Sequence, residues 1–130
     1  MAKKILIVDD SRTVRASLRN SLLAYEFIVL EAENGYVAIR AVGEEQPDLI
    51  FADVMMPRLD GYKFCAVVKS NPVFSYIPVI MLTSKDGMID QARAQLARAD
   101  GYMVKPFTRA AIQEVLAAHS IWQPPAETAA

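Results

Sequence analysis

Cysteine, histidine and tryptophan each occur once in this 130-residue sequence, and long apolar runs are absent. Because Cys65 stands alone, an intrachain disulfide and a cysteine metal cluster are excluded, and we expect a buried thiol on a helix. No apolar run approaches the ~20 residues that a membrane-spanning helix needs. The stretch after Lys3-Lys4 meets Asp9-Asp10 too early for a signal peptide. We therefore expect a cytoplasmic protein without membrane insertion.

An excess of charge of either sign is also missing. The 14 lysines and arginines nearly balance the 15 aspartates and glutamates, for a net charge of −1. Nucleic-acid binding usually shows as a basic face or stripe, so we expect no nucleic-acid partner. The length fits one domain, and 53% hydrophobic with 22% charged residues is typical of globular proteins.

Short apolar runs alternate with segments of helical period along the chain. The predicted strands are Lys4–Val8, Ile28–Ala32, Leu49–Asp53, Pro78–Leu82 and Gly101–Val104. Between and after them, helices are predicted around Val14, Leu18 and Leu22, and over Gly35–Glu44, Tyr62–Ser70, about Met88–Ala99, and Ala110–His119. This alternation predicts parallel βαβ units, and near-continuous apolar strands predict helices on both faces. The fold class is therefore α/β, a single doubly wound five-stranded parallel sheet.

The last four predicted helices, like the first, have an apolar face that should meet the sheet. These faces are Ala38, Ile39 and Val42; Phe64, Val67 and Val68; Ile89, Ala92 and Leu96; and Ile112, Val115 and Leu116. After the last helix, Pro124-Pro125 and small residues indicate a short flexible tail. We expect one domain over residues 1–121 and a tail over 122–130.

Polar residues stand where four of the apolar runs end. Asp9-Asp10 follow the first run, Asp53 ends the third, Thr83-Ser84 follow the fourth, and Lys105-Pro106 follow the fifth. Because parallel strands end at one edge of a sheet, where α/β proteins bind ligands, we expect these residues to converge.

The chemistry of this set indicates phosphoryl transfer. Adjacent carboxylates need a compensating cation, and an incomplete cage of hard oxygens suits Mg²⁺, with Mn²⁺ as an alternative. Pro106 restricts the backbone at Lys105 and permits a cis bond, and the ammonium can bind a phosphoryl group. Thr83 and Ser84 either hold phosphoryl oxygens or cap the next helix. A carboxylate nucleophile in such a pocket would form an acyl phosphate.

Other phosphate-binding motifs are excluded by a missing residue type. The loop after the first strand, Asp9-Asp10-Ser11-Arg12-Thr13, contains no glycine. Dinucleotide-binding turns and P-loops both need glycines there for close backbone approach to phosphate.

Four motifs resemble the bacterial response-regulator receiver domain, as in the single-domain chemotaxis protein CheY. They are "ILIVDDS" from Ile5, "PDLIFADVMMPRLDGY" from Pro47, "PVIMLTSKDG" from Pro78 and "GYMVKPF" from Gly101. The resemblance implies the sheet order 2-1-3-4-5 and a stand-alone regulator in a two-component phosphorelay.

The resemblance also implies roles for individual residues. Asp53 would be the phosphoacceptor, and Asp9, Asp10, Asp53 and the backbone carbonyl of Met55 would hold Mg²⁺. The phosphoryl-contacting and switch residues would be Thr83, Ser84, Lys105 and Tyr102. Signalling would then pass to a downstream protein through the face formed by the fourth helix, fifth strand and fifth helix.

Within the family, "MMPRLDGY" with "IMLTSKDG" looks most like the PilG-type regulators of type IV pilus twitching motility and chemotaxis-like systems. The implied partner is a CheA-type histidine kinase or phosphotransfer domain, and the implied state is a monomer or a weak phosphorylation-dependent dimer. In receivers, the residues at Met55 and Lys85 tune dephosphorylation. An apolar thioether cannot orient water, so we expect a long-lived phosphoryl group.

Two alternatives belong to other functional classes. A Mg²⁺-dependent phosphohydrolase with Asp53 as nucleophile would use a second aspartate two residues later, where this chain has Met55. A receiver fold that is never phosphorylated would normally have lost part of the pocket, whereas every element is present here. We therefore expect a regulator rather than a metabolic enzyme, one that catalyses only its own phosphotransfer and autodephosphorylation.

Overall fold

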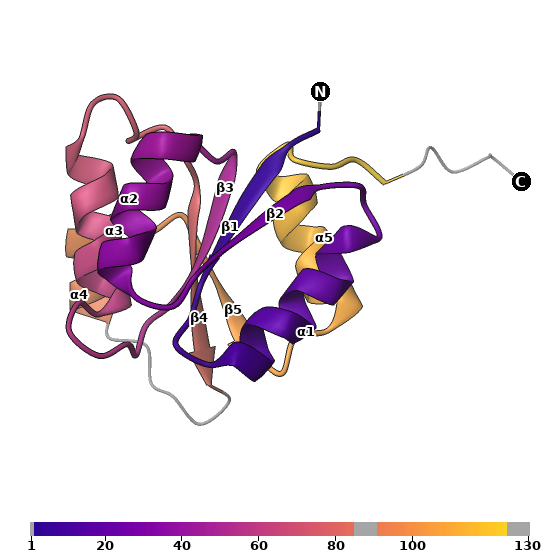
Figure 1. Cartoon of the computed structure of the whole chain (residues 1–130), viewed down its shortest axis with the longest axis horizontal. Coiled ribbons are helices and arrows are strands. Elements are labelled where there is room, and N and C mark those ends of the chain that lie inside the picture. The colour runs from indigo at the N-terminus through magenta and orange to yellow at the C-terminus, as the bar shows by residue number, and fades with distance from the viewer. Residues whose placement is uncertain (1, 85–90, 125–130) are drawn as a thin grey trace, which may run out of the picture.

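A computed structural model describes residues 2–84 and 91–124 of the chain. In these ranges five strands alternate with five helices (Figure 1). The elements are β1 Lys4–Val8, α1 Arg12–Leu23, β2 Ile28–Ala32, α2 Gly35–Glu45, β3 Leu49–Asp53, α3 Gly61–Ser70, β4 Val79–Ser84, α4 Gln91–Ala97, β5 Gly101–Lys105 and α5 Arg109–Ala118. Among the described residues, no helix is both long enough and apolar enough to cross a bilayer.

Polar side chains fix where four of the helices begin. Each of these residues stands just before its helix and accepts a hydrogen bond from a backbone N–H three residues further on. Such N-caps satisfy donors that the first helical turn leaves unpaired. The four capping residues are Ser11, Asn34, Asp60 and Thr108.

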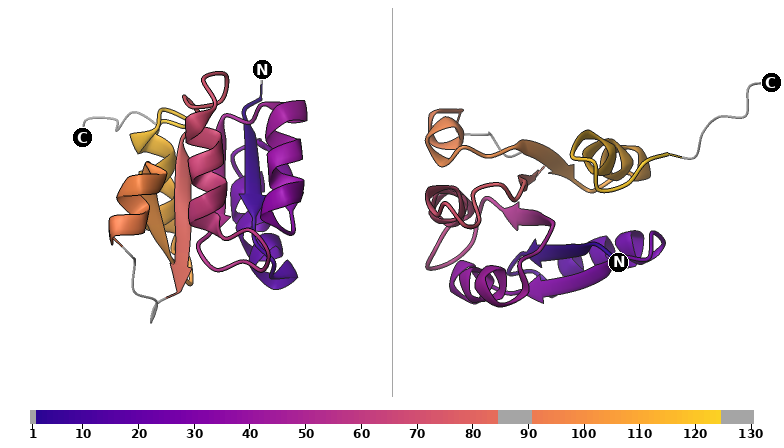
Figure 2. Two further views of the ribbon diagram at one scale, coloured as in Figure 1. Left: turned by 90° about the vertical axis from the view of Figure 1, so that its left-hand side faces the viewer. Right: turned by 90° about the horizontal axis from the view of Figure 1, so that it is seen from above.

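The five strands form one parallel sheet in the order β2-β1-β3-β4-β5, which confirms the predicted fold. Helices α1 and α5 cover one face, and α2, α3 and α4 cover the other (Figure 2). Strand β4 ends two residues later than predicted and β5 one residue later, because their pairing continues to Ser84 opposite Lys105.

Alternate residues of each central strand face opposite cores. In β1, Ile5 and Ile7 join the core under α1 and α5, while Leu6 and Val8 join the core under α2 and α3. All four side chains are fully buried. Burial on both sides explains why the sequence shows continuous apolar runs rather than alternation.

Helix α3 buries a different face from the predicted one. Phe64 and Val68 are buried as expected, but Val67 is 45% exposed and Cys65 takes the third core position. The predicted buried thiol is confirmed, and burial raises the pKa of Cys65 to about 12. The apolar faces of short helices are ambiguous by one position when valines stand side by side.

The predicted apolar face of α4 is wrong. Leu96 is 81% exposed and Ala92 is exposed, whereas Ala97 is buried. Cys65 Sγ lies 3.3 Å from the carbonyl oxygen of Ala97, to which it donates a hydrogen bond. Helix α4 therefore meets α3 through this small buried residue, and also through Arg93, which lies over the ring of Tyr62 and pairs with Asp60. Ile89 and the predicted helix start at Met88 lie outside the described residues.

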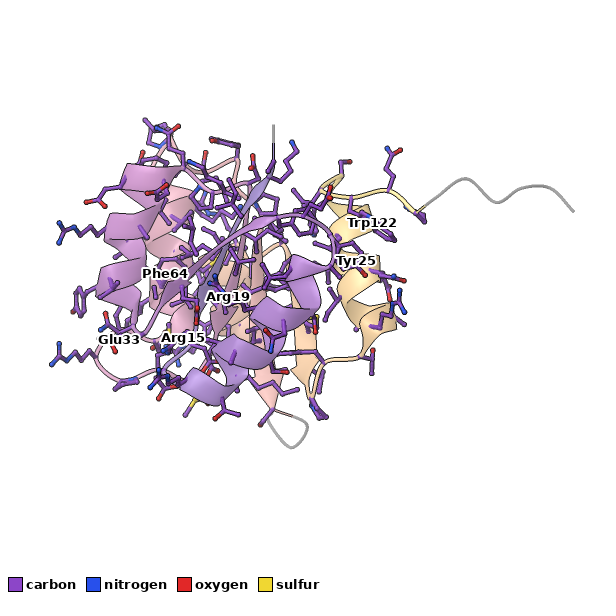
Figure 3. The ribbon with its side chains drawn as sticks, turned by 45° about the vertical axis from the view of Figure 1, so that its right-hand side comes forward. Arg15, Arg19, Tyr25, Glu33, Phe64 and Trp122 are labelled. Carbon is purple, nitrogen blue, oxygen red and sulfur yellow. The ribbon has the colours of Figure 1, made fainter. Side chains whose placement is uncertain are left out.

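The chain stays packed beyond α5. Trp122, the first residue of the predicted tail, lies edge-on to Tyr25 with ring centroids 5.1 Å apart (Figure 3). The N–H groups of Ile121 and Trp122 both donate to the carbonyl oxygen of Leu116, at 2.9 and 3.3 Å. Contacts with the core therefore continue at least to Trp122. Residues 125–130 lie outside the described part.

Two neighbouring valines of α3 provide a matched test of this packing. Val68→Ala should lower the free energy of unfolding by about 2 kcal/mol, because it removes two methyl groups from a site that is 3% exposed. Val67→Ala should change it by less than about 0.5 kcal/mol. Urea unfolding of both variants measures the difference. Equal losses of stability in the two variants would contradict the burial of Val68 and the exposure of Val67 in α3.

Candidate functional site

The strand ends place the predicted site residues on one edge of the sheet. Asp9 and Asp10 follow β1 directly, Asp53 is the last residue of β3, and Lys105 is the last residue of β5. The register pairs Val8 with Ala52 and Asp53 with Leu82, so the strands end nearly level. Residues far apart in the sequence thereby meet in one pocket.

Three carboxylates and one ammonium form the centre of this pocket. One carboxylate oxygen from each of Asp9, Asp10 and Asp53 lies within 4.8 Å of the others. Lys105 Nζ lies 2.9 Å from Asp9 Oδ2 and 3.0 Å from Asp53 Oδ2. Asp9 and Asp53 are buried, while Asp10 is exposed. One cation against three anions leaves an excess of negative charge.

Asp9 shows that this charge is not fully compensated. Its Oδ1 accepts a hydrogen bond from the Ser11 N–H at 2.8 Å. Its Oδ2 is within ion-pair distance of Lys105, yet this buried oxygen has no hydrogen-bonding donor among the described residues. Among the described residues this buried oxygen depends on the Lys105 ammonium, which it shares with Asp53, so a further cation would stabilise the site. The donor set, all hard oxygens, fits Mg²⁺.

The ion pairs hold Lys105 in its charged form. Burial by itself lowers the pKa of Lys105, but close contacts with the charged carboxylates of Asp9 and Asp53 outweigh burial and raise that pKa above its usual value. Because the pKa of Lys105 is higher in the folded chain than its usual value, its ion pairs stabilise the fold wherever the ammonium is charged. The stabilisation by these pairs is complete below the usual lysine pKa and is lost only as pH rises through the raised one. The Lys105–Pro106 peptide bond is cis, as the sequence permits.

Asp53 is held from two sides. Its Oδ1 accepts a hydrogen bond from the Met55 N–H at 3.0 Å, and its Oδ2 accepts one from Lys105 Nζ. The following residue, Val54, donates its N–H to the carbonyl oxygen of Leu82 at 3.0 Å, which ties the loop after β3 to β4. The orientation of the Asp53 carboxylate is therefore set by both its own loop and β5.

Gly61 is a site residue that sequence reasoning missed. It begins α3, and a Cβ atom there would overlap the backbone carbonyl of Asp53 and the side chain of Met81. Its N–H reaches the carbonyl oxygen of Val54 at 3.3 Å. Glycine at this position lets α3 close against the end of β3. The Asp60-Gly61 step in the sequence was the available signal, but it also occurs in ordinary turns.

The remaining predicted residues take different positions around the pocket. Thr83 is buried in β4, and Ser84 is exposed opposite Lys105. The Met55 side chain is 77% exposed beside the pocket. Tyr102 is half-buried in β5 against the core under α3, where burial first, and then Tyr62 and Cys65, raise its pKa. Lys85 lies outside the described residues.

The chain belongs to the class of doubly wound α/β domains, with an acidic pocket and a lysine at the carboxyl edge of its sheet. Within that class, residues 5–117 match the response regulator receiver domain, and the chain belongs to this family. It is 40% identical over 116 residues to protein PilG of Pseudomonas aeruginosa, a match that covers 89% of this chain and 86% of PilG. It spans about half the length of response regulator MprA of Mycobacterium ulcerans, with 39% identity over 117 residues, 90% of this chain and 48% of MprA.

Solved structures agree with this assignment. Chemotaxis protein CheY4 of Vibrio cholerae superimposes with a TM-score of 0.83 at 27% identity, over 91% of this chain and 98% of CheY4. The receiver domain of a sensor histidine kinase from Pseudomonas aeruginosa PAO1 gives a TM-score of 0.82 at 26% identity, over 91% of this chain and 97% of that one. The latter structure contains a magnesium ion coordinated in its active site cleft.

Two glycines test the close approach at the start of α3. Gly61→Ala should lower the free energy of unfolding by about 1–3 kcal/mol, because the new methyl group overlaps rigid backbone. Gly43→Ala, within α2, meets nothing within 4 Å and should raise it by about 0.5–1 kcal/mol. Chemical denaturation gives both values. A Gly61→Ala protein as stable as wild type would show that this contact can relax freely.

Proposed function

We propose that this response regulator accepts a phosphoryl group on Asp53 from a CheA-type histidine kinase or its phosphotransfer domain. The observation that carries the proposal is the Asp53 carboxylate, fixed between the Met55 N–H and the Lys105 ammonium beside two further carboxylates. A positioned carboxylate next to a compensating cation is the arrangement that an acyl-phosphate-forming nucleophile needs.

The acidic cluster is proposed to hold the divalent cation. Asp9, Asp10, Asp53 and the backbone carbonyl of Met55 would bind Mg²⁺, or Mn²⁺ in its place. When bound, the ion neutralises charge on the carboxylates and on the phosphoryl oxygens. The observation that supports a cation here is the buried Asp9 oxygen, which makes no hydrogen bond among the described residues and shares the Lys105 ammonium with Asp53. The magnesium-containing receiver from Pseudomonas aeruginosa supports the same choice of metal.

The transfer step is an in-line displacement at phosphorus. A carboxylate oxygen of Asp53 forms a bond to phosphorus, the bond from phosphorus to the histidine nitrogen breaks, and that nitrogen leaves with the electron pair. Lys105 supplies a fixed positive charge for a phosphoryl oxygen, and the hydroxyl groups of Thr83 and Ser84 supply donors. Catalysis is proposed to be limited to this self-transfer and to later hydrolysis of the acyl phosphate.

The output is proposed to be a change of shape on the α4–β5–α5 face. Thr83 would move toward the phosphoryl group, and Tyr102, half-buried in β5, would follow it. Leu96 and Val104 already expose 81% and 48% of their surface on these elements, which suits contact with a downstream protein. A local change in charge would thus bias a two-state element. We propose a monomer or a weak phosphorylation-dependent dimer.

The biological setting is proposed from relatedness. Similarity to PilG over most of the chain supports a cytoplasmic regulator of type IV pilus twitching motility or chemotaxis. Specificity for the kinase and for the effector would lie in exposed side chains around the pocket and on the α4–β5–α5 face. Receiver domains as a class work with histidine kinases and downstream effectors in this way.

Substitution of the phosphoacceptor tests the proposal directly. Asp53→Asn should abolish transfer of label from a phosphorylated CheA-type kinase, because an amide is not a nucleophile for this step. Asp48→Asn is the matched control, since Asp48 precedes the same strand at its other end and binds the Lys4 N–H at 2.8 Å. It should be labelled like wild type. Label on the Asp53→Asn variant would show that Asp53 is not the phosphoacceptor. In a separate assay, turnover of a small phosphomonoester by wild type would favour the phosphohydrolase alternative.

The lifetime of the acyl phosphate is proposed to depend on Met55. Its exposed thioether cannot orient an attacking water, so wild type should hydrolyse slowly. Met55→Asn should speed autodephosphorylation several-fold, whereas Met55→Leu should leave the rate unchanged. Decay of labelled protein with Mg²⁺, after removal of the kinase, gives the three rates. A wild-type rate equal to that of Met55→Asn would contradict the assigned role.

A further inference from the structure

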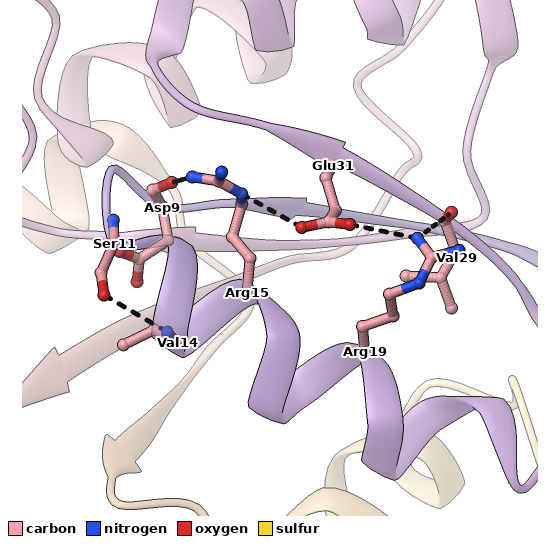
Figure 4. A network of polar contacts seen from close by, with 7 residues as sticks. All are labelled: Asp9, Ser11, Val14, Arg15, Arg19, Val29 and Glu31. Atoms are coloured by element: carbon pink, nitrogen blue, oxygen red, sulfur yellow. Dashed lines mark hydrogen bonds and ion pairs between the residues drawn. The ribbon is translucent and has the colours of Figure 1, made fainter.

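An arginine behind the acidic pocket connects it to the edge strand. Arg15 Nη1 on α1 donates a hydrogen bond of 2.6 Å to the backbone carbonyl of Asp9, and its Nε lies 3.1 Å from Glu31 Oε1 on β2 (Figure 4). Arg19, one turn further along α1, pairs with the other oxygen of Glu31 at 3.1 Å. It reaches the carbonyl of Val29 at 3.3 Å instead of Asp9. Figure 4 shows both arginine side chains reaching from α1 to Glu31 on β2.

The Arg15 contact acts on the peptide that joins two of the proposed metal ligands. The carbonyl group of Asp9 and the N–H of Asp10 belong to one planar unit. Fixing that oxygen therefore fixes the plane of the peptide that leads from Asp9 into Asp10 at the end of β1. On the other side, the Asp9 N–H donates to the carbonyl oxygen of Ala32 at 3.1 Å. Asp9 is thus held by backbone contacts both before and after its side chain.

The guanidinium itself is held in place. The side chain of Arg15 is only 15% exposed, compared with 41% for Arg19. A planar guanidinium can use separate N–H groups for Glu31 and for the Asp9 carbonyl at once, which a lysine ammonium on a flexible stem does less well. Glu31 therefore orients the arginine, and the arginine orients the turn.

We propose that Arg15 is a positioning residue for the cation site, and that Glu31 aligns it. It touches no reacting atom, and its effect passes through the Asp9–Asp10 peptide. The inference rests on the proposed function, in which Asp9, Asp10 and Asp53 hold Mg²⁺. Residues that orient metal ligands without touching the metal commonly have large effects on affinity.

Position and charge make opposite predictions for the loss of Arg15. The guanidinium is a cation near the pocket, so its charge alone repels Mg²⁺, and Arg15→Ala would tighten binding. If Arg15 positions Asp9 and Asp10, the same substitution weakens binding. Arg19→Ala removes an equal charge from the same helix and the same glutamate, yet leaves the Asp9 carbonyl bond intact.

The experiment is a titration of the purified, unphosphorylated full chain with Mg²⁺ alone, followed by calorimetry or by amide NMR shifts. Arg15→Ala should weaken the affinity on the order of tenfold. Arg15→Lys, which keeps the charge, and Glu31→Gln should weaken it to a smaller extent. Arg19→Ala should change it by less than about twofold, because a screened exposed charge acts weakly at this range.

A second readout needs no metal. The Ser11 N–H binds Asp9 Oδ1, so its hydrogen exchange in EDTA reports whether the turn is still ordered. Exchange should accelerate in Arg15→Ala and not in Arg19→Ala. If wild type fails to bind Mg²⁺, the proposed metal site fails while Ser11 exchange still decides the role of Arg15. If Arg15→Ala does not fold, Arg15→Lys carries both measurements.

Two results would overturn the inference. The first is Mg²⁺ affinity in Arg15→Ala that is equal to or tighter than in wild type, together with unchanged Ser11 exchange. The second is an equal loss of affinity in Arg15→Ala and Arg19→Ala, because that would assign the effect to the general attachment of α1 to β2.

Discussion

The structure depends on the balance of charge at the carboxyl edge of its sheet. Three aspartates meet there, and the ammonium of Lys105 is shared between Asp9 and Asp53 at ion-pair distance. This contact joins residues from the ends of β1, β3 and β5, so it links strands that are not all neighbours. One ammonium does not satisfy the set, since a buried oxygen of Asp9 still has no donor among the described residues. The pocket is therefore suited to receive a further cation.

Several contacts behind the pocket hold its residues in place. The strands are buried on both faces, and their packed cores resist displacement of the strand ends. Gly61 lets α3 close against Asp53, and Arg15 ties the turn after β1 to the edge strand. The side that is proposed to signal presents apolar side chains to solvent, since Leu96 on α4 and Val104 on β5 are exposed. An acidic pocket held by packed strands, beside a face with exposed apolar residues, suits a switch in which a local change of charge alters a binding surface.

Much of this arrangement could be predicted from the order of residues along the chain. Membership of the receiver family and the sheet order were both indicated by motifs at the strand ends, and both are confirmed. The convergence of Asp9, Asp53 and Lys105 followed from parallel strands alone. By contrast, the burial of Val68 rather than Val67, and the exposure of Leu96, could not be predicted, because neighbouring apolar residues fit a helical stripe equally well.

The order of residues along the chain dictated the alternation of strands and helices, and the identity of the groups at the strand ends. It did so because buried strands need unbroken apolar runs, and because parallel strands place their last residues together. The atomic contacts among those groups depend instead on how the helices pack against the sheet. Three contacts join separate elements of the fold. Gly61 packs against the Asp53 backbone, Arg15 binds the Asp9 carbonyl, and Trp122 packs on Tyr25. Such contacts depend on distances between elements, which no local pattern of residues records.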